Sequence, residues 1–167
     1  MPTEEFTDAI ALLKADHRAV EALFAKFEKA GDGDKQKIAT KICNELKIHA
    51  MIEEEIFYPA MEGTLDQDKY DEMFVEHDSA KVIINDIMAG APDDEFYDAK
   101  VKVLSEEIEH HVGEEEKNST GVFAVARQSD VDLVAMRDQL LARKQELQMQ
   151  AENGGLPEAE LTALQSN

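Results

Sequence analysis

The stretch HAMIEEEIFYP, residues 49–59, combines a helical apolar pattern with acidic residues that a helix core would normally exclude. The three consecutive glutamates, 53–55, point in three directions about 100° apart on a helix. Because residues four apart share one side of a helix, Glu53 faces the same way as His49. The stretch therefore directs a histidine and a carboxylate together, and the flanking sequence has to show whether they face water or the core.

Helical periodicity continues on both sides of this stretch, with short breakers between the periodic segments. We expect helices over residues 7–30 with Thr7 as the N-cap, 35–60 after the breaker GDGD, 65–89, 93–116 (or from nearer Ala99) and 130–150 capped by Ser129, and a short terminal helix from Pro157. Short connections place long neighbouring helices antiparallel. The pattern predicts an all-α fold, an up-down-up-down four-helix bundle with an additional C-terminal helix. We expect residues 1–127 to form the bundle and residues 128–167 to form a helical extension packed on it.

Composition limits the partners and the compartment. The chain has 167 residues, enough for a domain with a sizeable core, and a formal net charge of −20. That charge disfavours nucleic acid and anionic membranes, which repel an acidic surface. There is no signal-peptide pattern or membrane-length apolar run, and Cys43, which we expect to be a buried inert thiol, is the only cysteine. These features predict a cytoplasmic protein, a monomer or a small homo-oligomer.

Each of the first four expected helices carries a histidine in its apolar stripe, and two of these histidines have a glutamate four residues on. The set is His17, His49 with Glu53, His77, and His111 with Glu115. One buried histidine alone is usually a hydrogen-bonded core residue, and acidic runs are usually solvated. An unpaired buried carboxylate, however, is costly in a purely structural core. Four imidazoles and two carboxylates meeting inside a bundle predict a site for a pair of transition-metal ions.

Two features of the site are left open by the sequence alone. The phase of the fourth helix selects His111 and Glu115, with His110 and Glu114 as the alternates if that phase is wrong by one residue. One of three tyrosines could also reach a pocket: Tyr58, Tyr70 or Tyr97. Imidazole suits iron, zinc, copper or nickel, and the lack of cysteine and methionine clusters disfavours copper(I) and iron–sulfur centres.

The order of these motifs resembles the hemerythrin-like HHE cation-binding family of the bacterial type, over about residues 7–127. The motifs are His17, HAMIEEEIFYP, EHD at 76–78 and HHVGEEE at 110–116. The resemblance implies a non-haem di-iron site, with two oxo- or hydroxo-bridged iron ions per chain, that binds oxygen or a related small molecule such as nitric oxide or peroxide. It further implies that His17 and His49 hold one iron, His77 and His111 hold the other, and Glu53 and Glu115 bridge them.

Two departures from the family pattern affect the expected function. Oxygen carriers of the family have a second histidine four residues before the position of His77, where this chain has Met73, a poor ligand for iron. We therefore expect an open or water-filled position on that iron and a sensor or a redox or stress-response protein. The segment KNSTGVF after the last acids predicts a looped or longer end of the fourth helix. Alternatives are a di-iron enzyme that decomposes peroxide, iron storage or delivery, and a metal-free bundle acting through its surface.

Overall fold

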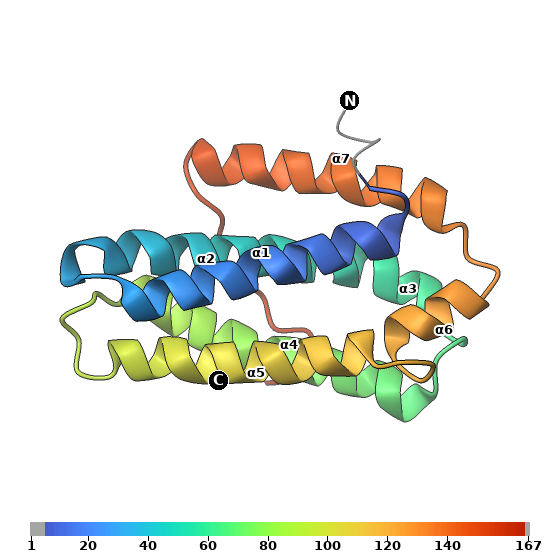
Figure 1. Cartoon of the computed structure of the whole chain (residues 1–167), viewed down its shortest axis with the longest axis horizontal. Coiled ribbons are helices and arrows are strands. Elements are labelled where there is room, and N and C mark those ends of the chain that lie inside the picture. The colour runs from blue at the N-terminus through green and yellow to red at the C-terminus, as the bar shows by residue number, and fades with distance from the viewer. Residues whose placement is uncertain (1–5, 166–167) are drawn as a thin grey trace.

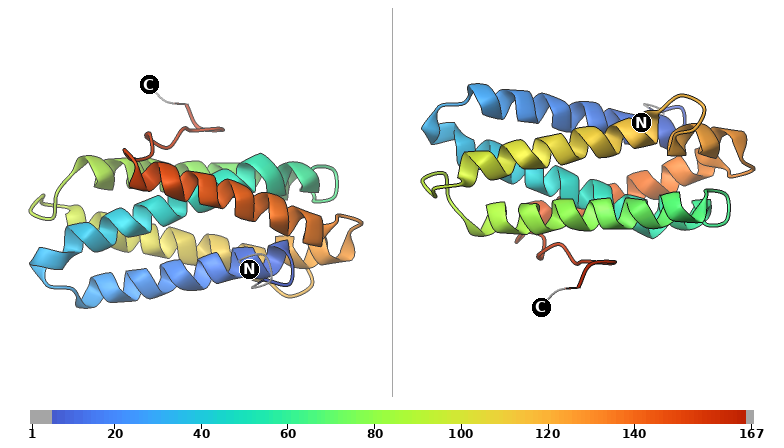
Figure 2. Two further views of the ribbon diagram at one scale, coloured as in Figure 1. Left: turned by 90° about the horizontal axis from the view of Figure 1, so that it is seen from above. Right: turned by 90° about the horizontal axis from the view of Figure 1, so that it is seen from below.

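Four long helices run side by side along the molecule in the computed structural model, which describes residues 6–165 (Figures 1 and 2). They are α1 (Ala9–Lys29), α2 (Asp32–Ile52), α4 (Gln67–Ala89) and α5 (Tyr97–Glu116). The α2 helix continues through the π-helix η2 (Glu53–Phe57) into α3 (Tyr58–Met61). After α6 (Val122–Gln128), α7 (Leu133–Glu152) packs on α1 and α2. The prediction of an all-α bundle with an additional C-terminal helix is confirmed. Among the described residues, no helix is long and apolar enough to cross a membrane.

Several helix ends differ from the expected ones, in two cases because an aspartate caps the free backbone groups. Asp8, rather than Thr7, caps α1 by accepting a hydrogen bond from the Ala11 amide at 2.9 Å. Asp132, rather than Ser129, caps α7. The α2 helix begins inside the GDGD run, where the acidic side chains in its first turn favour the positive end of the helix dipole. The α5 helix begins at Tyr97, close to the later of the two expected starts, and a loop separates its end from α6.

The expected terminal helix from Pro157 is wrong. Gly154 and Gly155 have φ angles of +128° and +91°, which turn the chain back over the bundle. Residues 157–164, which we call the C-terminal strap, then cross the molecule without regular structure (Figure 2). The strap is held by Asp78, Lys81 and Asn85 of α4. Its backbone groups bond to these side chains instead of to a helical turn.

The core is divided into two apolar clusters along the bundle axis. One cluster includes Leu13, Ile52 and Met73, and the other includes Val20 and Leu46. In α1, His17 lies between Leu13 of the first cluster and Val20 of the second. A layer of buried polar residues thus separates two apolar ends, and the apolar ends fix the helices around it.

Candidate metal centre

The six residues expected to bind metal all lie in this buried polar layer. Glu53 and Glu115 have no exposed surface, and the four histidines are at most 8% exposed. Nitrogen and oxygen atoms of these residues form two groups, each with its atoms within 4.8 Å of one another: His17, His49, Glu53 and Glu115 in the first, and Glu53, His77 and His111 in the second. Glu53 belongs to both groups.

The two carboxylates lie between imidazoles of different groups. Oε1 of Glu53 is 3.3 Å from Nε2 of His49 and 3.2 Å from Nε2 of His77. Oε1 of Glu115 is 3.3 Å from Nε2 of His17 and 3.5 Å from Nε2 of His111. Each glutamate thus connects one histidine of the first group with one of the second, as a carboxylate shared by two ions would.

The polar atoms that lack partners are consistent with a bound cation. Among the described residues, four buried side-chain atoms have no hydrogen-bond partner: His17 Nε2, His49 Nε2, Glu53 Oε2 and Glu115 Oε1. A buried polar group left unsatisfied costs about 1–3 kcal/mol, and such groups are uncommon in native proteins. All four belong to the first group of candidate ligands. Neutral imidazoles and carboxylates are the donors that a transition-metal ion takes, so the residues fit such an ion.

A ring of acids orients the four histidines. The Nδ1 atom of each histidine bonds a carboxylate on an adjacent helix of the bundle. The pairs are His49–Asp16 at 2.9 Å, His77–Glu54 at 2.7 Å, His111–Glu76 at 2.7 Å and His17–Glu116 at 2.6 Å. We call these four acids the outer carboxylates. Because Nδ1–H donates outward, the Nε2 atom that faces the centre is the one free to bind a metal.

The outer carboxylates were missed in the sequence, although a signal was present. Each of them adjoins a candidate ligand: Asp16 precedes His17, Glu54 follows Glu53, Glu76 precedes His77 and Glu116 follows Glu115. Each of them, however, bonds the histidine of another helix rather than a neighbour in sequence. Most residues of the acidic runs at 53–55 and 114–116 therefore face the centre or its histidines, and only part of each run is solvated surface.

Charge in the metal-free centre is balanced by protons. Burial alone would lower the pKa of His77, but its contacts with Glu53 and Glu54 raise it to about 9. Burial would also lower the pKa of His49, but the nearby carboxylates of Glu53 and Asp16 outweigh burial and hold that pKa well above its ordinary value. Burial would raise the pKa of Glu53, yet His49 and His77 hold it well below its usual range. A cation bound here would replace protons on the imidazoles.

A π-helical turn at the end of α2 brings a further residue into the centre. Pro59 has no amide hydrogen to give to the carbonyl of Glu55, and its ring would crowd a regular helical turn. The backbone instead widens over Glu53–Phe57, and the Tyr58 amide bonds the carbonyl of Glu53, five residues earlier. Residues five apart then share one side, so Tyr58 lies over Glu53.

The Tyr58 hydroxyl contacts four of the expected ligands. It donates to Oε2 of Glu115 at 2.9 Å, and it lies 3.1 Å from Nε2 of both His77 and His111 and 3.3 Å from Oε1 of Glu53. Burial, followed by the nearby negative charges of Glu115 and Glu53, raises the pKa of Tyr58 well above its ordinary value. Of the three tyrosines considered from the sequence, Tyr58 is the one in the centre. Tyr70 and Tyr97 pack in the two apolar clusters.

Comparison with known proteins identifies the family. A family model of the hemerythrin HHE cation binding domain matches residues 8–119. The chain belongs to this family. A DNA nickase from Nostoc sp. (strain PCC 7120) is 27% identical over 117 residues, which make up 70% of this chain but only 32% of that protein. The crystal structure of an HHE cation binding domain-containing protein from Mycobacterium kansasii gives a TM-score of 0.73 at 18% identity. The match covers 89% of this chain and 91% of that one, and it shows the shared fold.

The alternates on α5 lie at the edge of this HHE domain. The side chain of His110 is 63% exposed and its Nε2 is 3.2 Å from Oε2 of Glu76, which also bonds His111. Glu114 pairs with Lys69 on the surface side. His110 forms a further group of possible ligands with Glu72 and Glu76, but this group is partly exposed. The structure therefore brings His111 and Glu115 into the buried centre and leaves His110 and Glu114 outside it.

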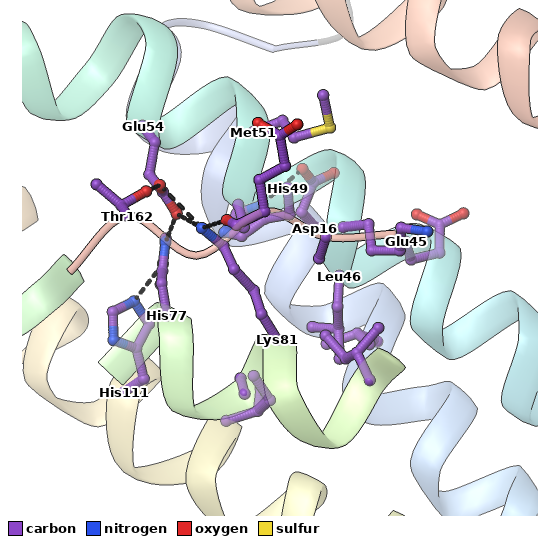
Figure 3. A pocket seen from close by; sticks show the side chains of 18 of the residues that line it. Asp16, Glu45, Leu46, His49, Met51, Glu54, His77, Lys81, His111 and Thr162 are labelled. Atoms are coloured by element: carbon purple, nitrogen blue, oxygen red, sulfur yellow. Dashed lines mark hydrogen bonds and ion pairs between the residues drawn. The ribbon is translucent and has the colours of Figure 1, made fainter. Parts of the chain in front are cut away.

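A cavity connects the centre of the HHE domain with the C-terminal strap. Its volume is about 320 Å³, and residues of α1, α2, α4, α5 and the strap line it, including all four histidines of the centre. Figure 3 shows Thr162 of the strap and Lys81 of α4 both bonded to Glu54, the outer carboxylate of His77. The strap therefore closes this side of the cavity and contacts the ring of outer carboxylates.

Proposed function

We propose that this HHE domain binds two iron ions, oxo- or hydroxo-bridged when oxidised, and uses them to sense or detoxify oxygen, nitric oxide or peroxide. His17 and His49 would hold one ion, His77 and His111 the other, with Glu53 and Glu115 shared. The observation that carries the proposal is the membership of Glu53 in both groups of donor atoms. Imidazole and carboxylate donors suit several transition-metal ions including iron, and iron is the metal that the resemblance to the family implies.

The chain supplies the surroundings in which such a metal pair would act. When bound, two irons supply redox chemistry toward small oxygen and nitrogen species. The outer carboxylates hold each Nε2 toward the centre, and burial keeps bulk water from the six donors. Met73 lies in an apolar cluster, so the His77 and His111 side has two imidazoles and the Tyr58 hydroxyl. This set favours a site that reacts with an incoming small molecule over one that only carries it.

Metal analysis tests the proposal directly. Aerobically purified protein should contain two irons per chain and absorb in the near ultraviolet, and Glu53→Ala should lose at least one iron. A fully loaded Glu53→Ala protein would argue against a shared carboxylate. Rapid mixing of the reduced, loaded protein with oxygen should give oxidation that deoxygenation does not reverse. Reversible uptake would indicate transport instead, and turnover of added peroxide would indicate an enzyme.

The cellular partners follow from charge rather than from the relatives. The chain spans only about a third of the length of the Nostoc DNA nickase. The net charge of −20 opposes binding to DNA or to anionic membranes. We therefore propose small molecules as the partners and the cytoplasm as the compartment. We also propose residues 1–127 as the bundle domain and 128–167 as an extension packed on it.

A further inference from the structure

The cavity under the strap is larger than the small molecules proposed for the metal centre. Its volume of about 320 Å³ corresponds to roughly ten waters at about 30 Å³ each, whereas a diatomic gas needs about one such space. Cavities above about 300 Å³ are in the range that binds organic ligands. The cavity therefore has room for an organic molecule that reaches the centre.

The lining indicates a molecule with an apolar body. Aliphatic side chains from four helices form much of the wall, namely Val20, Leu46, Ala80, Ile84 and Ile108. Pro157 and Ala159 of the strap add to it. An unbranched or compact hydrocarbon body would replace water against these side chains, which is favourable by about 25 cal/mol for each Å² of apolar surface buried.

One cation in the cavity wall lacks a partner. Lys47 of α2 is only 5% exposed, lines the cavity, and forms no hydrogen bond or ion pair with any residue from 6 to 165. Lys81, the other buried lysine of the wall, is saturated by Glu54, Asp78 and the carbonyl of Glu160. A carboxylate in the cavity would supply the charge-assisted hydrogen bond that no described residue gives the Lys47 ammonium.

We propose that the cavity binds an organic monoanion of the medium-chain carboxylate class, with its carboxylate on Lys47 and its apolar body along Leu46, Ala80 and Ile84. The proposal rests on the proposed function only in that the metal centre would form one wall of the site. The contact with Lys47 does not need a metal. The ligand would enter beside the strap or while the strap is displaced.

Calorimetric titration with octanoate tests the site, in iron-loaded protein and in protein stripped with a chelator. Octanoate should bind wild-type protein in both forms, and more tightly than 1-octanol, which lacks the charge, or acetate, which lacks the body. Lys47→Met keeps most of the side-chain volume. It should weaken the binding of octanoate at least about tenfold, as expected for the loss of a charge-assisted hydrogen bond. The matched control is Lys41→Met, because Lys41 is an exposed lysine of the same helix, and it should leave the affinity unchanged.

Several outcomes would overturn the proposal. These are equal affinity for octanoate and 1-octanol, unchanged octanoate binding in Lys47→Met, or octanoate binding that requires iron and ignores Lys47, which would place the carboxylate on the metals. If Lys47→Met lacks the helical circular dichroism of wild type, Ala80→Val decides instead, because a filled cavity should weaken octanoate but not acetate. Iron content is measured separately, so a failure of the iron proposal and a failure of the octanoate site give different results.

Discussion

Oε2 of Glu116 lies 2.6 Å from Nδ1 of His17, and this contact turns the Nε2 atom of His17 toward Glu115 and the centre of the bundle. Glu116 belongs to α5 and His17 to α1, so the contact also joins the first and last helices of the bundle. With the other three outer carboxylates, it closes a ring in which every histidine is oriented by a neighbouring helix. Metal affinity should therefore depend on residues that never touch the metal.

We predict that Glu116→Ala weakens metal binding about 10- to 100-fold without abolishing it, the usual effect of removing a hydrogen-bond partner from a metal-binding histidine. Competition with a chelator measures the affinity. Glu116 also pairs with Arg18 at 2.7 Å, so Arg18→Met is the matched control that leaves the contact with His17 intact. Equal losses in both variants would show that the ion pair, and not the orientation of His17, is responsible.

Tyr58→Phe removes one oxygen from the His77 and His111 side and preserves the packing of the ring. We expect the variant to fold normally and to retain less metal on that side, with a changed visible spectrum if the hydroxyl contacts the ion. Metal content and absorption of loaded protein measure both effects. Tyr70→Phe is the control, because Tyr70 packs against Phe74 in the apolar cluster away from the ligands. If Tyr58→Phe has the metal content and the absorption spectrum of the wild type, the Tyr58 hydroxyl has no role in metal binding and the ring serves packing alone.

His111→Ala and His110→Ala form a pair of adjacent substitutions on one helix. His111→Ala should lose metal, since His111 is buried with its Nε2 toward the centre, whereas His110→Ala should retain it because that side chain is largely exposed. Metal analysis of the two variants, purified in the same way, compares how much metal each retains. Greater loss in His110→Ala would mean that α5 has the other phase in the loaded protein.

The parts of the structure that the sequence predicted are those that helical periodicity controls. His17, His49, His77 and His111 occupy stripe positions, so their convergence follows once four apolar stripes pack together. Tyr58 was harder to place, because it reaches the centre only through the π-helical turn that Pro59 imposes. A regular helix would turn Tyr58 away from Glu53.

The strap shows the opposite case, in which tertiary contacts override local preference. The segment from Pro157 has a composition suited to a helix, but its backbone amides bond Asp78 of α4, a residue distant in sequence. The position of Lys47 in a cavity wall could likewise not be predicted from the sequence, because the strap that completes that wall is placed by contacts with α4. The starts of α1 and α7 were shifted by one and three residues because Asp8 and Asp132 cap them.

The metal-free protein should lose stability as the pH rises from about 6.5 to about 9. The pKa of His77 is about 9 in the folded protein, above the ordinary 6.5 of an unfolded chain, so the folded state binds more protons in this interval. The stabilisation from His77 is thus complete below pH 6.5 and lost as the pH passes 9. The raised pKa values of His17 and His49 have the same sign.

Urea unfolding of stripped protein at several pH values measures this dependence. Loaded protein should show a smaller slope, because metal has replaced the protons on the imidazoles. His110→Gln provides the control, since its side chain is largely exposed and should leave the slope unchanged. If the free energy of unfolding of the stripped protein stays constant or increases between pH 6.5 and 9, the raised pKa values described for the histidines of the centre are contradicted.

The last prediction concerns Asp78, whose fully buried carboxylate accepts hydrogen bonds from the backbone amides of Thr162, Ala163 and Leu164. Hydrogen bonds to a charged group contribute about 1.5–3 kcal/mol each, so Asp78→Ala should free the strap while the apolar clusters hold the bundle together. Hydrogen exchange at these three amides should accelerate at least about tenfold. A chelator should also remove metal faster, because the strap closes one side of the cavity beside the centre. Asp86→Ala, at an exposed aspartate of the same helix paired with Lys100, should change neither rate. Faster exchange without faster metal release would show that the strap is bound by Asp78 but does not control access to the centre.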